Sequence, residues 1–133
     1  MILDSSALIA ILRAEPEAAR FADAIERATA RRISAVNYVE AAAVMDRSRD
    51  PVARRRFDEL LRDIQAIVEP VTIRQARIAR EAYRDFGRGS GHRARLNLGD
   101  CFAYALAKEC GEPLLFKGDD FSCTDVPCAV LDE

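Results

Sequence analysis

The sequence lacks the features that mark membrane, secreted and multidomain proteins. Among its 133 residues, no run approaches the roughly 18 consecutive apolar residues that a membrane span requires. Its first segment, MILDSSALIAILRAEPE, has neither the basic flank nor the small-residue cleavage site of a secretory signal. Apolar residues make up 50% of the chain, which is enough for one core. We therefore expect a single soluble domain over residues 1–133, located in the cytoplasm.

Paired cysteines and a second histidine are also missing. The four cysteines form no C-x2-C pair, so a zinc site is not indicated, and without an export signal free thiols are favoured over disulfides. His92 is the only histidine, whereas a metal-free ribonuclease with paired general acid and base needs two. The chain has no G-x-S-x-G elbow and no Walker loop. The cysteines are Cys101, Cys110, Cys123 and Cys128.

A strong net charge is missing as well, because 22 acidic and 20 basic residues leave a formal charge of −2. The whole surface is therefore not an electrostatic footprint for nucleic acid. Basic side chains instead gather in the segment 84–95, which holds three glycines. Two interpretations stay open: a flexible loop that wraps its basic residues around phosphates, or a mobile solvated loop whose charge serves solubility. The basic residues are Arg84, Arg88, His92, Arg93 and Arg95, of which Arg88, Arg93 and Arg95 are the candidate substrate contacts.

The pattern that is present is an alternation of short apolar runs with helical periodicity. The resulting order, β-α-α-β-α-α-β-α-α-β-β, indicates an α/β fold with a short, mainly parallel sheet and helices on both faces. Pro16 is expected in the first turn of the second helix. The predicted strands cover residues 1–3, 32–35, 67–68, 114–116 and 128–131, and the predicted helices cover 6–13, 17–28, 37–47, 51–64, 72–83 and 101–109.

Acidic residues stand where these strands end or helices begin. In an open parallel sheet the ligand site lies beyond the carboxyl ends of the strands. An aspartate at such a position is often only a helix cap, and Asp100 taken alone fits that description. Glu40 lies among apolar neighbours, so its carboxylate needs a cation or a hydrogen-bond donor. The acids concerned are Asp4, Glu40, Asp100, Asp119 and Asp120.

Several carboxylates at one sheet edge repel one another unless a multivalent cation cancels their charge. Ligand sets made only of oxygen select hard ions such as Mg²⁺ or Mn²⁺. The chemistry that follows is phosphodiester hydrolysis, in which metal ions activate a water molecule for in-line attack. The sequence therefore predicts a metal-dependent nuclease.

These residues resemble a PIN domain, and specifically the VapC family of toxin ribonucleases. The similarity covers nearly the whole chain and rests on MILDSSALIAIL, SAVNYVEAA and LNLGDCFAYALAKECGEPLLFKGDDFSCTDV. It implies an α/β/α sandwich, and an endoribonuclease that cuts transfer or ribosomal RNA at a single-stranded loop and inhibits translation. It also implies a homodimer, and a VapB-type antitoxin that blocks the acidic pocket with a basic side chain.

The resemblance assigns roles to individual residues. Many relatives have an aspartate two places before the Asp-Phe pair, where this sequence has Gly118. That departure leaves open whether one or two metal ions bind. We assign the first three acids to Asp4, Glu40 and Asp100, with Ser6 supporting the first, and the fourth to Asp120, with Asp119 as the alternative and Asp125 as an outer candidate.

The implied antitoxin needs a groove on the surface of the chain. The candidates for its walls are two helices with apolar faces, 17–28 and 52–64. The alternative is that these apolar faces only pack in the core. Two other functions remain open. One is a DNA-directed PIN nuclease, since nothing in the chain distinguishes a reader of the 2′-hydroxyl. The other is a catalytically silent PIN module that binds only its antitoxin and operator DNA. The presence of all the main acids in this sequence argues against that function.

Overall fold

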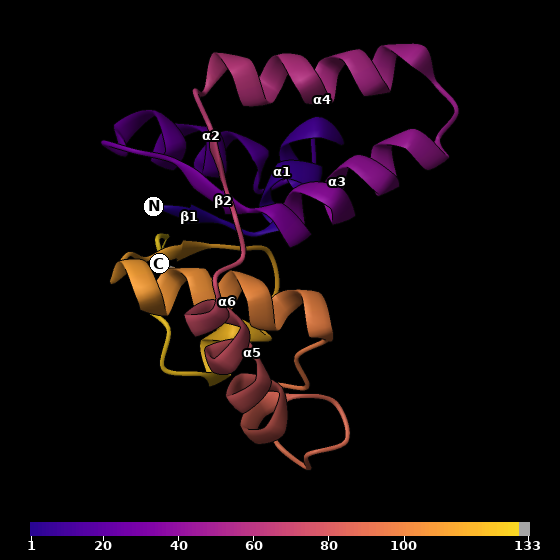
Figure 1. The fold of residues 1–133 in the computed structure, drawn as a ribbon. Coiled ribbons are helices and arrows are strands. Elements are labelled where there is room, and N and C mark those ends of the chain that lie inside the picture. The colour runs from indigo at the N-terminus through magenta and orange to yellow at the C-terminus, as the bar shows by residue number, and fades with distance from the viewer. Residues whose placement is uncertain (131–133) are drawn as a thin grey trace.

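A computed structural model describes residues 1–130, which form a parallel sheet flanked by helices (Figure 1). In that described part, no helix combines the length and apolar character needed to cross a membrane. The elements are β1 (Ile2–Leu3), α1 (Ser5–Leu12), α2 (Ala18–Arg27), β2 (Arg32–Ser34), α3 (Ala35–Arg47), α4 (Pro51–Asp63), β3 (Ile67–Glu69), α5 (Ile73–Phe86), α6 (Leu98–Cys110), β4 (Leu114–Leu115) and a 3-10 turn (Phe121–Cys123).

The strands lie in the order β3-β2-β1-β4, and every pairing is parallel. Ile2 is opposite Arg32 on one side and Leu114 on the other, while Arg32 is opposite Ile67. Each pair of successive strands in the chain is joined by two helices, because a parallel connection must carry the chain back to the starting edge. All carboxyl ends of the strands therefore lie at one edge of the sheet.

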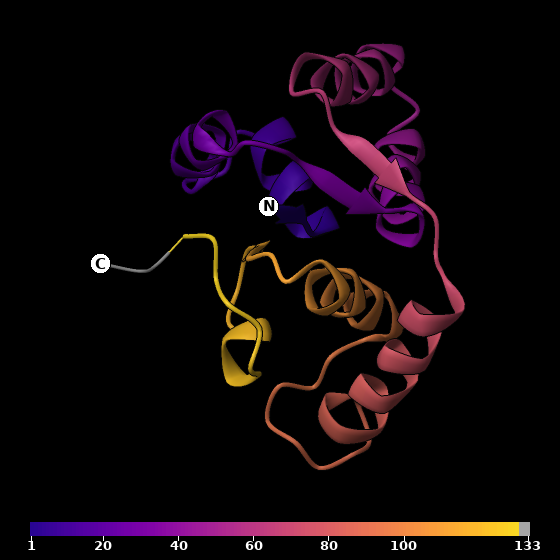
Figure 2. The same cartoon turned by 60° about the vertical axis from the view of Figure 1, so that its left-hand side comes forward.

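Alternate side chains of the central strands enter two separate cores. Ile2 and Leu114 pack with α5 and α6, whereas Leu3, Ile33 and Leu115 pack with α1, α2, α3 and α4. These five side chains are at most 1% exposed. The sheet is thus the middle of three layers, with α5 and α6 on one face and the first four helices on the other (Figures 1 and 2). The predicted α/β/α architecture is confirmed.

Two helices are longer than predicted. α5 continues to Phe86 instead of ending at Tyr83, because Phe86 packs on Tyr104 of α6 with ring centroids 5.8 Å apart. Arg84 therefore belongs to the helix and not to the glycine-rich loop. α6 begins at Leu98, since the Asn97 side chain accepts a hydrogen bond from the backbone nitrogen three residues on.

Two other predictions were wrong in detail. The expected strand 128–131 is only a single bridge between Cys128 and Leu114, and Leu131 lies outside the described residues. Pro127 directly precedes it and has no N–H to extend a ladder. Pro16 lies in a turn before α2 and not in its first helical turn.

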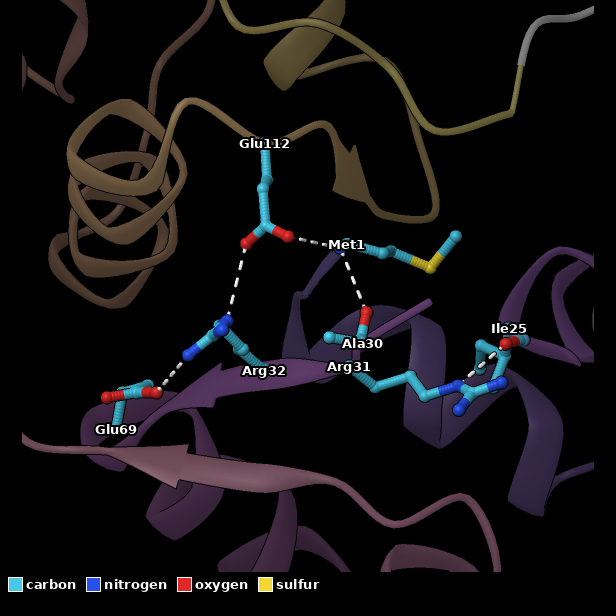
Figure 3. A network of polar contacts seen from close by, with 7 residues as sticks. All are labelled: Met1, Ile25, Ala30, Arg31, Arg32, Glu69 and Glu112. Atoms are coloured by element: carbon cyan, nitrogen blue, oxygen red, sulfur yellow. Dashed lines mark hydrogen bonds and ion pairs between the residues drawn. The ribbon is translucent and has the colours of Figure 1, made fainter. Parts of the chain in front are cut away.

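A charged network links the four strands (Figure 3). The Met1 ammonium donates to the Ala30 carbonyl at 3.0 Å and to Glu112 at 3.1 Å. Arg32 pairs with Glu69 at 2.7 Å and with Glu112 at 3.5 Å. Met1 precedes β1, Arg32 opens β2, Glu69 ends β3 and Glu112 precedes β4, so these contacts tie all four strands to one another.

Candidate active site

Four acids come from separate elements to the carboxyl edge of the sheet. Asp4 directly follows β1, and Glu40 lies in α3, which begins immediately after β2. Asp100 lies in the first turn of α6, and Asp120 follows β4. The charges of Asp100 and Glu40 act on Asp4, and those of Asp120 and Glu40 act on Asp100. Residues far apart in the chain therefore share one electrostatic environment.

Asp4 caps the start of α1, and this contact holds its carboxylate in place. It is 2% exposed, and its Oδ2 accepts hydrogen bonds from the Ser6 backbone nitrogen at 3.1 Å and the Ser6 hydroxyl at 2.5 Å. The Ser6 hydroxyl in turn accepts from the Lys117 backbone nitrogen at 3.0 Å, which ties it to the segment after β4. The other carboxylate oxygen, Oδ1, is buried without a hydrogen-bond partner. One oxygen is thus fixed by Ser6 and the second is available to a ligand.

The site opposes the ionisation of two of its acids. Burial, together with the charges of Asp100 and Glu40, raises the pKa of Asp4 from 3.8 to about 7, although the Ser6 hydrogen bonds lower it. Burial, together with the charges of Asp120 and Glu40, raises the pKa of Asp100 from 3.8 to about 6, although the hydrogen bond from the Asn97 backbone and the charge of Arg88 lower it. A bound cation would relieve both penalties.

Glu40 is positioned by two residues that the sequence analysis did not select, Asn37 and Gly99. The Asn37 amide is fully buried and donates to Glu40 Oε1 at 2.8 Å and to the Gly99 carbonyl at 3.1 Å. A methyl group built on Gly99 would overlap the Glu40 carboxylate, well inside the 3.0 Å that real Cβ contacts keep. The donor that Glu40 needs in apolar surroundings is therefore Asn37, and any side chain at position 99 would force the Glu40 carboxylate to move.

Signals for both residues exist in the sequence. Asn37 precedes Glu40 by three positions, so the two side chains share one face of α3. Gly99 lies in the first turn of a helix, where glycine costs about 1 kcal/mol relative to alanine and points to a close approach by another group.

Asp100 is a helix cap as well as a member of the acidic group. Its Oδ2 accepts from the Asn97 backbone nitrogen at 3.0 Å, and its own nitrogen donates to Asn97 Oδ1 at 2.8 Å. This capping box orients the start of α6 and holds the carboxylate at the sheet edge.

Asp120 and Asp125, two of the candidates for the fourth acid, have different surroundings. The negative charge of Asp120 raises the pKa of Asp100. Asp125 is engaged elsewhere, since it accepts from the Tyr104 hydroxyl at 2.6 Å and pairs with Lys108 at 2.8 Å. The Lys108 and Tyr104 hydrogen bonds hold the pKa of Asp125 below its usual range.

The oxygen atoms of these acids suit a hard divalent cation, but the side chains are not yet arranged around one binding point. Within residues 1–130, no three His, Cys, Asp or Glu side chains are grouped closely enough to hold one ion. Three of the acids are instead engaged by local donors, Ser6, Asn37 and Asn97. The all-oxygen donor set and the unpartnered buried Asp4 Oδ1 are what a hard cation needs. The carboxylates must therefore rearrange to bind one ion together.

The glycine-rich loop after α5 is internally bonded. Gly87 and Leu96 form a bridge across its neck, and the Ser90 hydroxyl donates to the Gly87 carbonyl at 2.6 Å. The His92 ring packs edge-on against Phe86 at 5.0 Å, and its Nδ1 accepts from the Ala94 nitrogen at 3.0 Å. Histidine thus shapes the loop.

Of the candidate substrate contacts, Arg88 is linked electrostatically to the acids. Burial is the main cause of the raised Asp100 pKa, and the positive charge of Arg88 opposes it. Arg93 and Arg95 are exposed on the loop.

The raised pKa values predict a pH-dependent stability of the metal-free protein. Unfolded aspartates release their protons near pH 3.8, whereas folded Asp100 and Asp4 keep theirs to about 6 and 7. The unfolded chain therefore binds fewer protons across this window, and the free energy of unfolding falls as pH rises through it. For Asp4 the decrease in the free energy of unfolding is at most about 4 kcal/mol.

In chelator, the thermal midpoint should be lower at about pH 7.5 than at about pH 5, and Mg²⁺ or Mn²⁺ should raise it mainly at the higher pH. A midpoint that rises steadily from acid to neutral pH would contradict the shifts.

Asn37→Ala should weaken divalent-metal binding about 10–100-fold, because Glu40 then lacks the donor that orients it. Calorimetric titration with Mn²⁺ measures the affinity. Gln75→Ala is the matched control: Gln75 is also a buried amide, and it donates to Glu109 at 2.5 Å. Both variants should lose stability, but only the first should lose metal affinity. Equal metal affinities in the two would assign Asn37 a purely structural role.

The chain is similar to known proteins in sequence and in fold. The sequence model of the PIN domain family matches residues 1–126. The chain is 58% identical over 130 residues to ribonuclease VapC28 of Mycobacterium tuberculosis, covering 98% of each. It is 54% identical over 126 residues to ribonuclease VapC42 of the same organism, covering 95% of this chain and 96% of the relative.

Two solved structures share the fold. One is Mycobacterium tuberculosis VapC20, described as a sarcin-ricin loop cleaving toxin, with a TM-score of 0.72, 16% identity, and coverage of 94% of this chain and 95% of that one. The other is a toxin-antitoxin complex from Klebsiella pneumoniae, with a TM-score of 0.70, 16% identity, and coverage of 91% and 89%.

Proposed function

The chain belongs to the PIN domain family as an endoribonuclease toxin of the VapC type, and from this premise we propose that it hydrolyses structured RNA with Mg²⁺. Ribonucleases of this family use a divalent metal ion, and Mn²⁺ is the alternative ion here. The proposed ligands are Asp4, Glu40, Asp100 and Asp120. The proposed substrate is transfer or ribosomal RNA, and cleavage of either inhibits translation.

The observation that carries the proposal is the convergence of charge on Asp4. The Asp4 side chain is 2% exposed, one of its carboxylate oxygens has no hydrogen-bond partner, and the negative charges of Asp100 and Glu40 act on it. Its ionised form is therefore unstable unless a cation binds to it. Its pKa of about 7 means that protons and metal ions compete for it near neutral pH.

The chain's own residues prepare the reaction. Ser6 fixes one Asp4 oxygen, Asn37 and Gly99 hold Glu40 against the start of α6, and the capping box with Asn97 orients Asp100. Mg²⁺, when bound, supplies the Lewis acid that polarises the phosphodiester and promotes attack by water. Arg88 adds positive charge beside Asp100, where it attracts a phosphate.

The test is cleavage of end-labelled RNA and of DNA with the same sequence, each with Mg²⁺, Mn²⁺ or chelator. We expect metal-dependent cleavage of RNA only, with the cut located by sequencing the new 5′ ends. Cleavage of DNA instead would support the DNA-directed alternative. Metal-independent RNA cleavage would exclude the acidic site as its source, and operator binding without any cleavage would support the silent module.

A VapB-type antitoxin is the proposed protein partner. α2 and α4 border a hollow of about 180 Å³ whose walls include Ile11, Ile25, Leu60 and Ile64. Buried Phe57 on the inner face of α4 shows that these helices also serve the core. The hollow suits an apolar anchor of an antitoxin helix. A charged substitution there, Leu60→Asp, should weaken binding of the cognate antitoxin while RNA cleavage is retained.

A homodimer is also proposed. Two large apolar side chains beside the acidic group, Val39 and Leu98, are 61% and 59% exposed, and they are sequence neighbours of Glu40 and Gly99. A second copy of the chain that covers Val39 and Leu98 would bury this apolar surface and would also shield the acidic site from water. Light scattering of the purified protein measures the mass directly, and a monomer at all concentrations would overturn this part.

A further inference from the structure

We propose that Arg77, Arg80 and Arg84, on the exposed face of α5, form a binding track for the phosphate backbone of RNA that leads to the acidic site. The inference rests on the proposed function and deepens it, because it assigns a second contact region for the same substrate. These three residues make up the α5 track.

The three arginines form one surface. Positions 77, 80 and 84 are spaced by three and four residues, so they lie on the same side of α5. Together with Glu81 they line a surface hollow of about 400 Å³. From the first to the last arginine, the helix axis advances about 10 Å, a length over which the three guanidinium groups can contact neighbouring phosphates of one strand.

The track lies in the basic part of an otherwise acidic chain. Residues 73–95 hold seven of the chain's 20 basic residues but only two of its 22 acidic ones. Those two acids are Glu81, which borders the hollow, and Asp85, which pairs with Arg84 at 2.9 Å. Exposed ion pairs of this kind are weak, so the Arg84 charge stays available to a phosphate.

The track is continuous with the acidic site through the loop that follows α5. Figure 2 shows α5 at the outside of its layer and the loop returning from its end to α6. Arg88 is one helical turn beyond Arg84 in sequence and lies at the bridged neck of the loop, where its backbone nitrogen donates to the Leu96 carbonyl at 3.0 Å, four residues before Asp100 in the first turn of α6. A strand that lies along the track is therefore directed toward the carboxylates.

The chemistry of the hollow favours nucleic acid over a protein partner. Its walls consist of three arginines and one glutamate, without an apolar side chain. A docked helix or strand needs an apolar anchor, which the hollow between α2 and α4 provides and this one does not. Guanidinium groups bind phosphate through paired hydrogen bonds, and such contacts do not depend on base sequence.

The experiment compares Arg77→Gln/Arg80→Gln with a matched control, Arg55→Gln/Arg56→Gln, which removes the same charge from the exposed face of α4. Binding of labelled, unfractionated bacterial transfer RNA is measured in chelator at several salt concentrations, with duplex DNA of similar length in parallel. The α5 variant should bind RNA about tenfold more weakly, and the slope of log affinity against log salt should decrease by about 1.4 for two lost contacts. The control should bind as the wild type does. Arg77→Lys/Arg80→Lys, which keeps the charge, should recover most of the affinity.

Equal RNA binding by the two glutamine variants would overturn the inference, as would a loss confined to duplex DNA. Unchanged thermal midpoints verify that both variants fold. Failure of the α5 track is distinguishable from failure of the proposed function, because cleavage by the wild type is measured separately. A wild type that cuts RNA, with a variant that binds RNA normally, contradicts only the track.

Discussion

Asp4→Asn is expected to abolish RNA cleavage and, in the absence of metal, to stabilise the fold. The loss of cleavage should be at least about 1000-fold, equivalent to about 4 kcal/mol, because Asp4 is a proposed ligand of the divalent cation. The stabilisation arises because ionised Asp4 costs the folded state about 4 kcal/mol at neutral pH, given its pKa of about 7. The new amide loses only about 1–3 kcal/mol for an unpartnered N–H group at the position of Oδ1.

The thermal midpoint in chelator at about pH 7.5 should therefore increase by roughly 3–10 °C in Asp4→Asn, and Mg²⁺ should no longer raise it. Expression of this variant should also no longer arrest growth. The matched control is Asp125→Asn, since Asp125 pairs with Lys108 and Tyr104 away from the acidic group. That change should lower the midpoint and leave cleavage unchanged. An Asp4→Asn protein that still cuts RNA would exclude the assigned site, and one that is less stable than the wild type at neutral pH would contradict the raised pKa.

Gly99→Ala is expected to reduce cleavage by about 100-fold or more, although alanine is normally the better helix former by about 1 kcal/mol. The added methyl group overlaps the Glu40 carboxylate, which must move and lose its hydrogen bond from Asn37. Displacement of a ligand by about 1 Å is enough for a loss of this size. Cleavage rate and Mn²⁺ affinity should decrease together, while the thermal midpoint changes little.

A double-mutant cycle with Glu40→Ala identifies the cause of that loss. If the methyl group acts only by displacing Glu40, adding Gly99→Ala to Glu40→Ala should cost no further activity. A fully additive loss would mean that Gly99 acts through another contact, such as its carbonyl bond to Asn37.

The local elements were predictable because each has its own signal. Thr72 and Asp50 cap α5 and α4 as helix-start residues should, and Pro51 occupies the first turn of α4. The resemblance to VapC ribonucleases, carried by three sequence motifs, is confirmed by the relatives at 58% and 54% identity. The ends of α5 and α6 were not predictable from periodicity, because the Phe86 contact with Tyr104 and the Asn97 cap decide them.

The alternation of strands and helices, the parallel sheet and the candidate acids at its carboxyl edge could be predicted from the sequence. Hydrophobic periodicity and capping act over a few residues, so both are visible in the chain. The packing of the layers establishes that Asn37 and Gly99 contact the Glu40 carboxylate, that Asp125 pairs with Tyr104 and Lys108, and that Arg84 extends the face of Arg77 and Arg80. These relations depend on contacts between segments as many as 62 residues apart, as for Asn37 and Gly99, and such contacts exist only once the layers have packed.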